Sequence, residues 1–138
     1  MIDESQVVCL DGPGGVEAVL TPNHAVGGRK MVIVPLDASR AIVIEVRTRQ
    51  GLDANLCGEG VLVYEVSAAI APGAGPALIL GSRASTSGTP YQTCGPWADG
   101  TFATGPGAVS SFTHAPSGTS ITVLGPEASG AWRVRVKR

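Results

Sequence analysis

Hydrophobic and polar residues alternate along several short segments of the chain, most clearly over residues 132–138. Successive side chains of an extended strand point to opposite faces, so every second residue shares a face. The apolar positions of this segment are Trp132, Val134 and Val136. The positions between them are basic: Arg133, Arg135 and Lys137. The pattern predicts a strand that buries one face and leaves the other in water.

Other short segments have the length and composition of strands, and turns rich in Gly and Pro separate them. They cover residues 6–10, 16–20, 30–36, 41–48, 61–66, 77–80, 109–112 and 119–124. The four residues between 30–36 and 41–48 fit the loop of a hairpin. Two segments, 50–60 and 81–100, have no hydrophobic period, and we expect them to be loops.

The composition also favours strands over helices. Gly and Pro contribute 29 of the 138 residues, and both are poor in the interior of a helix. Val, Ile and Thr contribute another 33, and their branched side chains suit a pleated sheet. We therefore expect an all-β fold, an antiparallel β-sandwich of about 8–10 short strands. The length fits one domain over residues 1–138, with no internal repeat.

The charge of the chain excludes several classes of protein. Ten basic and 11 acidic residues give a net charge of -1, without a block of either sign. A nucleic-acid partner is not expected, because phosphate binding needs a basic surface. No apolar run approaches the roughly 20 residues of a membrane span, so no membrane association is expected. The N-terminal residues lack the features of a signal peptide, which suggests either an intracellular protein or an internal piece of a longer secreted one.

Three cysteines, Cys9, Cys57 and Cys94, are spaced too widely for a zinc knuckle. They could be buried free thiols. Cys57 and Cys94 lie in Gly-rich predicted loops, where exposed thiols would be a liability, so we favour one disulfide formed outside the cell. The spacing does not decide which two cysteines pair, and the third would be free or bonded to a cysteine elsewhere.

Catalytic groups are hard to find in the sequence. His24 and His114 are 90 positions apart in turn-like contexts, without a second metal ligand nearby, so we expect exposed loop histidines. The chain has no GxSxG nucleophile motif and no Gly-rich phosphate-binding motif between a strand and a helix. We therefore assign no catalytic residue and no zinc site.

Glu45 and Glu65 are the exceptions, because each interrupts an apolar strand and the two predicted strands are consecutive. The two carboxylates could act as an acid and base, could bind Ca²⁺ with Asp53, or could face water on the outer side of a sheet. The last arrangement is the commonest, and Arg47 and Arg49, on the same alternation as Glu45, are placed to form cross-strand salt bridges there. Solvated glutamates are therefore the expectation.

The loop 50–60 is the only oxygen-rich loop, with Asp53, Asn55 and Glu59 as candidate ligands. Its spacing lacks the DxDxDG pattern of a calcium loop. We expect no cofactor, and calcium at these three residues is the alternative.

Three consecutive pieces of the chain carry a family resemblance: 41–47 with Glu45 and Arg47, then Gly51-Leu52-Asp53, then 58–64. Together they resemble a run "E-x-R … G-x-D … G-x-G-[VL]-L-[VI]-[YW]" in secreted zinc metallopeptidases of the immune inhibitor A type and related actinobacterial extracellular peptidases. In those proteins the run lies downstream of the HExxH helix. The opening residues 2–7 are similar to the entry strand of the same region.

The departures from that family decide what the resemblance implies. HExxH is absent, and the usual "H-x-D" after the aromatic is replaced by Glu65-Val66-Ser67. The resemblance therefore implies a non-catalytic accessory β domain of a secreted metallopeptidase. Its partner would be the protease catalytic domain of the same parent chain, on which it would pack or to which it would shape access. The alternative is a free-standing module that binds carbohydrate or a cell surface, with Tyr91 and Trp97 of the long predicted loop as possible ligand contacts.

Overall fold

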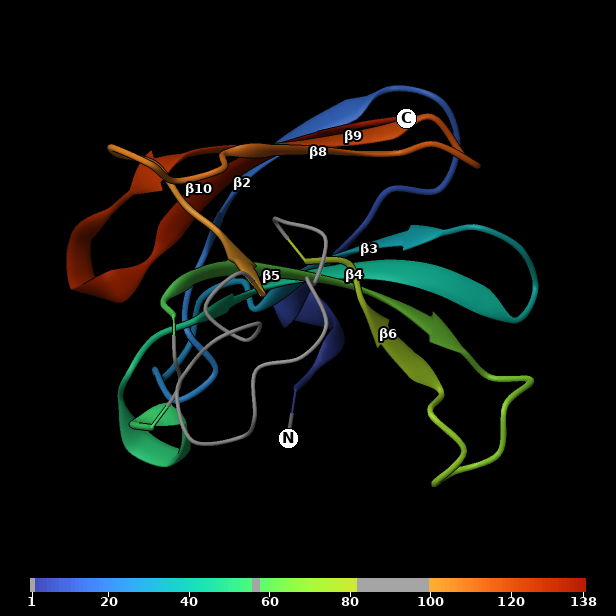
Figure 1. Cartoon of the computed structure of the whole chain (residues 1–138), viewed down its shortest axis with the longest axis horizontal. Coiled ribbons are helices and arrows are strands. Elements are labelled where there is room, and N and C mark those ends of the chain that lie inside the picture. Colours follow the sequence, from blue (N-terminus) through green and yellow to red (C-terminus); the bar gives the residue numbers. More distant parts are fainter. Residues whose placement is uncertain (1, 56–57, 82–99) are drawn as a thin grey trace.

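Two β-sheets lie face to face in the computed structural model, which describes residues 2–55, 58–81 and 100–138 (Figure 1). Short 3-10 helices, η1, η2 and η4, cover Glu4–Gln6, Gly51–Asp53 and Ala128–Gly130. The strands are β1 (Val7–Cys9), β2 (Gly15–Leu20), β3 (Met31–Pro35), β4 (Arg40–Arg47), β5 (Gly60–Ser67), β6 (Ala77–Ile79), β7 (Thr101–Phe102), β8 (Ser111–His114), β9 (Thr119–Pro126) and β10 (Trp132–Lys137). Within the described residues, no helix is long and apolar enough to span a membrane.

The first sheet has the strand order β1-β3-β4-β5-β6, and β7 pairs with β5 beside β6. All of its pairings are antiparallel except the parallel pair β1–β3. The second sheet has the order β2-β10-β9-β8 and is antiparallel throughout. The second sheet therefore joins β2, from the N-terminal part of the chain, to the C-terminal strands β8, β9 and β10, because the chain crosses between the sheets after β1, β2 and β7.

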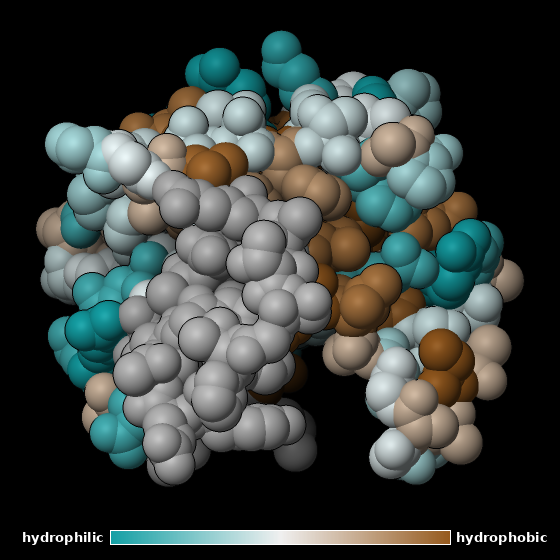
Figure 2. All heavy atoms as spheres, viewed as in Figure 1, coloured by the Kyte–Doolittle hydropathy of each residue, from teal (hydrophilic) through white to brown (hydrophobic). Residues whose placement is uncertain are grey.

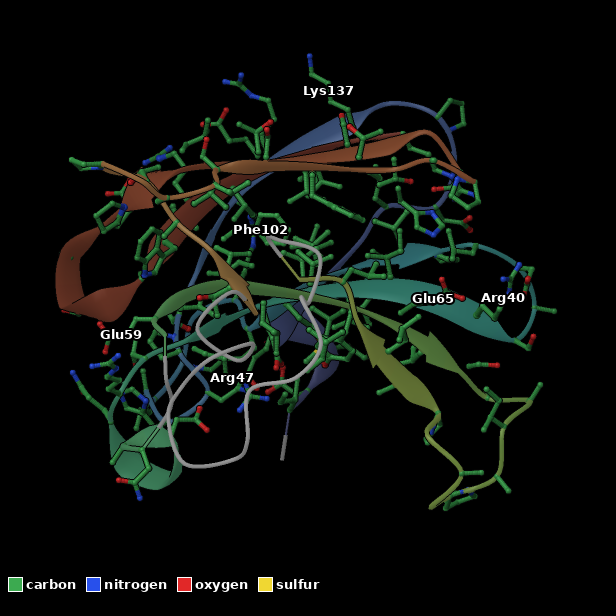
Figure 3. All side chains as sticks on the ribbon, in the orientation of Figure 1. Arg40, Arg47, Glu59, Glu65, Phe102 and Lys137 are labelled. Atoms are coloured by element: carbon green, nitrogen blue, oxygen red, sulfur yellow. The ribbon has the colours of Figure 1, made fainter. Side chains whose placement is uncertain are left out.

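The core between the sheets is built from the apolar positions of the alternating segments. Its members are almost entirely aliphatic, and Phe102 is the one aromatic side chain among the described residues that is fully buried (Figure 3). Val134 and Val136 of β10 are fully buried in this core and Trp132 packs against it. The basic residues of β10 lie on the outer surface, where Arg135 pairs with Glu17 of β2 at 3.0 Å.

The sequence predictions for the fold are confirmed in their main points. The chain is an all-β, antiparallel-rich sandwich, and every predicted segment overlaps a strand. The predicted hairpin is β3–β4, in which the Asp37 carboxylate accepts hydrogen bonds from the backbone N–H groups of Ser39 and Arg40. The prediction missed β7, which is only two residues long, and placed β8 two residues too early.

Candidate functional site

An ionic cluster made by Glu45, Arg47 and Asp53 lies at one end of the first sheet. Glu45 points to the outer face of β4 but is only 2 % exposed. The guanidinium of Arg47 donates to the carboxylate of Glu45 through Nε at 2.8 Å and through Nη2 at 2.5 Å. The same guanidinium donates to Asp53 Oδ2 of η2 at 3.0 Å. One arginine therefore pairs with two carboxylates, and we call these three residues the Glu45 cluster.

Neighbouring loops cover the Glu45 cluster. The amide of Asn23, in the loop between β2 and β3, donates to Glu45 Oε2 at 3.4 Å. Tyr64 of β5 lies beside the same carboxylate, and burial together with the negative charge of Glu45 raises the pKa of Tyr64 to about 12. Burial opposes the charge of Arg47, but its hydrogen bonds to Asp53 and the charge of Glu45 outweigh burial, so the pKa of Arg47 is raised.

Lys30 fixes the loop from which Asn23 reaches the cluster. Its side chain is buried, and its ammonium donates to Thr21 Oγ1 at 2.9 Å and to the carbonyl oxygens of Pro22 at 2.8 Å and Ala25 at 2.6 Å. All three acceptors are neutral. Burial lowers the pKa of Lys30, because the low dielectric disfavours its charged form. The ammonium thus holds the loop much as a bound cation would.

The expectation that Glu45 and Glu65 are solvated outer-face residues is wrong. Glu45 is buried under the loops just described, and its salt bridge to Arg47 runs along one strand rather than between strands. Glu65 is opposite Ile42 in the ladder and therefore lies on the inner face of the sheet. Since the two glutamates point to opposite faces, the structure does not bring them together as an acid–base pair.

The calcium alternative at Asp53, Asn55 and Glu59 finds no support in the geometry. Asp53 is committed to Arg47, Asn55 is exposed, and Glu59 accepts a hydrogen bond from the backbone N–H of Arg49 at 2.5 Å. Within the described ranges, no group of three or more His, Cys, Asp or Glu residues is placed to hold a metal ion.

A small polar pocket lies at the opposite end of the sandwich, between the two sheets. Its volume is about 240 Å³, and side chains of both sheets line it, with Glu65 and Arg40 from the first (Figure 3). Glu65 Oε1 is 3.4 Å from Arg40 Nη1, and Glu65 Oε2 is 3.4 Å from His114 Nε2 of β8. Arg40 also pairs with Asp37 at 2.7 Å.

His114 is buried, so the expectation of an exposed loop histidine is wrong for this residue. It ends β8, and its Nδ1 lies 2.8 Å from Ser117 Oγ, which in turn is 2.8 Å from Thr119 Oγ1. Although Ser117 and His114 are in contact, the serine hydroxyl is tied to Thr119, as expected of a structural turn rather than of a nucleophile. His24 is exposed in a turn, as predicted.

Some predicted residues lie outside the part of the chain that the structure describes. These are Cys57 and Cys94, two of the three disulfide candidates, and the possible ligand contacts Tyr91 and Trp97. The remaining cysteine, Cys9, is an exposed free thiol on β1.

The sequence analysis missed Lys30 and Arg40. Lys30 starts the predicted strand 30–36, where a charged terminal residue gives no sign of burial. The arginine had a detectable signal, since an Asp-x-x-Arg pair across a hairpin loop places the two charges close together.

Comparisons with protein-family models, with curated proteins and with solved structures found no match to this chain.

Proposed function

We propose that this chain is a non-catalytic accessory β domain of a secreted metallopeptidase, and that it packs on the protease catalytic domain of the same parent chain. The supporting observation concerns the residues that carry the resemblance. Glu45, Arg47 and Asp53 are the fixed positions of "E-x-R … G-x-D", and in this chain they form one ion-pair cluster. The motif therefore has a structural explanation that fits a domain without catalytic residues.

The glycines of the motif fit the same explanation. Gly51 starts η2 with a φ of +61°, and Gly60 starts β5 with a φ of +137°, both values that side chains disfavour. A Cβ atom on Gly60 would also lie 2.4 Å from the carbonyl oxygen of Phe102. The two glycines thus allow the loop between β4 and β5 to return Asp53 to Arg47 and let β7 approach β5.

Secretion and a disulfide belong to the same proposal. The disulfide we propose joins two of the three cysteines, of which Cys9 alone lies within the described residues, where it is exposed. Under oxidising conditions the chain should carry one titratable thiol after denaturation without reductant, and peptide mapping should show which cysteine it belongs to. Three thiols would contradict a disulfide.

The alternative, a free-standing carbohydrate-binding or cell-surface module, depends on Tyr91 and Trp97. Both residues lie outside the described ranges, so the structure adds no support to this alternative. The accessory domain is therefore the better supported function.

The decisive test is the reading frame that encodes this chain, which should encode an HExxH catalytic unit upstream. The two parts can then be produced separately and mixed. We expect the purified chain to hydrolyse no casein, and to raise the melting temperature of the catalytic unit when added in excess. A reading frame without HExxH, chelator-sensitive hydrolysis by this chain alone, or a catalytic unit whose melting temperature is unchanged would each refute the proposal.

A further inference from the structure

Among the residues that the structure describes, the edge of the first sheet at β6 presents backbone groups without a hydrogen-bond partner. The N–H of Ser67 donates to the carbonyl of Pro76 at 2.8 Å, and that of Leu80 donates to the carbonyl of Val63 at 2.9 Å. Backbone groups in an antiparallel ladder face the partner strand at every second residue. Those of residues 76, 78 and 80 therefore face β5, and those of Ala77 and Ile79 point away from the sheet. Within the described residues, no strand pairs with that outer edge.

The surface around this edge is apolar and uncharged. Residues 67–81 contain no Asp, Glu, Lys or Arg, although 15 % of the whole chain is charged. Leu78 is 63 % exposed and Ile79 is 43 % exposed, and Ile70 of the connecting turn is also exposed. The β5–β6 hairpin projects from the body of the sandwich, and hydrophobic atoms gather near it (Figures 1 and 2). Natural proteins usually protect such an edge with charged side chains, since it is a template for pairing.

We infer that β6 is a docking edge for a second copy of this chain, joined by antiparallel pairing of the two β6 strands around a two-fold axis. Centred on Leu78, this pairing sets Ala77 of one copy opposite Ile79 of the other. The outward N–H and C=O groups of both residues then form four hydrogen bonds, and the two Leu78 side chains meet across the axis. The two first sheets become one continuous sheet.

A second copy is the occupant that fits the chemistry of this edge. It brings a strand of the same length with the same outward alternation, so every unpaired group on one side finds a partner on the other. It also brings no charge into the contact, because its own residues 67–81 are uncharged. A charged partner strand would have to bury charges against Leu78 and Ile79, which is costly.

The test compares two substitutions of one residue, measured in the whole chain with reductant present so that Cys9 cannot cross-link copies. Ile79→Pro removes an outward N–H that makes no hydrogen bond to β5, so the monomer should keep its fold while pairing is blocked. Ile79→Val keeps that N–H and most of the side chain. Sedimentation velocity, from about 10 µM to 1 mM protein as suits a small interface, measures the association.

We expect a concentration-dependent dimer for the parent and for Ile79→Val, and a monomer for Ile79→Pro with the circular dichroism of the parent. A parent that stays monomeric throughout this range overturns the inference, and so does an Ile79→Pro protein that dimerises like the parent. If Ile79→Pro fails to fold, hydrogen exchange of the parent decides. The amides of Ala77 and Ile79 must become protected as the concentration rises, and unchanged exchange overturns the inference.

Discussion

Removing the carboxylate of Glu45 should destabilise the fold far more than removing a carboxylate from the surface. Glu45 is almost fully buried and accepts hydrogen bonds from Arg47 and Asn23. Glu45→Ala would take away one partner of a buried ion pair, which typically costs about 3 to 5 kcal/mol. We expect about 3 kcal/mol, the lower end of that range, because Asp53 still compensates Arg47 and the arginine is 30 % exposed.

The expected loss can be measured as a melting temperature. With an unfolding entropy of about 2.1 cal/mol/K per residue, a loss of about 3 kcal/mol lowers the melting temperature by roughly 10 °C in a chain of this length. Glu17→Ala is the matched control, because Glu17 also lies on a strand and pairs with two arginines, Arg133 and Arg135, but is well exposed. Its melting temperature should stay within about 2 °C of the parent, since exposed ion pairs contribute little.

Thermal unfolding followed by circular dichroism, with urea unfolding as a second measurement, separates these outcomes. A Glu45→Ala protein that melts within about 2 °C of the parent would show that the Glu45 cluster is not a structural element. Equal losses for both variants would show that burial is not what distinguishes the two glutamates.

Three further predictions follow from single side chains. In a rapid pH jump, the phenol of Tyr64 should titrate near pH 12, and this titration should be missing in Tyr64→Phe. The phenol ionises near pH 10 in the unfolded chain. The free energy of unfolding should therefore fall as the pH rises from about 10 to 12, because the folded state holds the phenol proton more tightly than the unfolded state does. Trp132→Ala should cost about 3 kcal/mol in urea unfolding, whereas Arg135→Ala should change the free energy of unfolding by less than about 0.5 kcal/mol; equal losses would refute the register of β10. Lys30→Met should cost about 1 to 3 kcal/mol, because the loop oxygens that accept its hydrogen bonds lose their donor, and an unchanged urea midpoint would contradict that role.

The strands could be predicted from the sequence because their signal is local. In β4, Ile42, Ile44 and Val46 are fully buried, as their alternation requires. β7 escaped detection because a two-residue strand has no period. It exists because Phe102 fills the core and because Gly60 lets its backbone approach β5.

The polar contacts could not be predicted, because they depend on residues distant in the sequence. Alternation correctly places Glu45 on the face opposite Ile44, but it does not reveal that the loop carrying Asn23 folds over that face. Likewise, the local sequence around His114 is typical of a turn, and it does not reveal that the fold brings β8 opposite Glu65, which lies 49 positions earlier in the chain. Burial of a polar side chain in this fold is therefore a property of the tertiary arrangement.

The same contacts explain why the first sheet is protected at one end and open along one edge. Lys30 holds the loop between β2 and β3, and Arg47 holds η2 through Asp53, so a buried cation fastens one connection over the sheet and a half-buried ion pair fastens the other. The segment 67–81, which includes β6, has no charged residue and hence no such fastening. Its backbone edge and apolar side chains are therefore available to another polypeptide. Pairing of two copies through β6 would cover both.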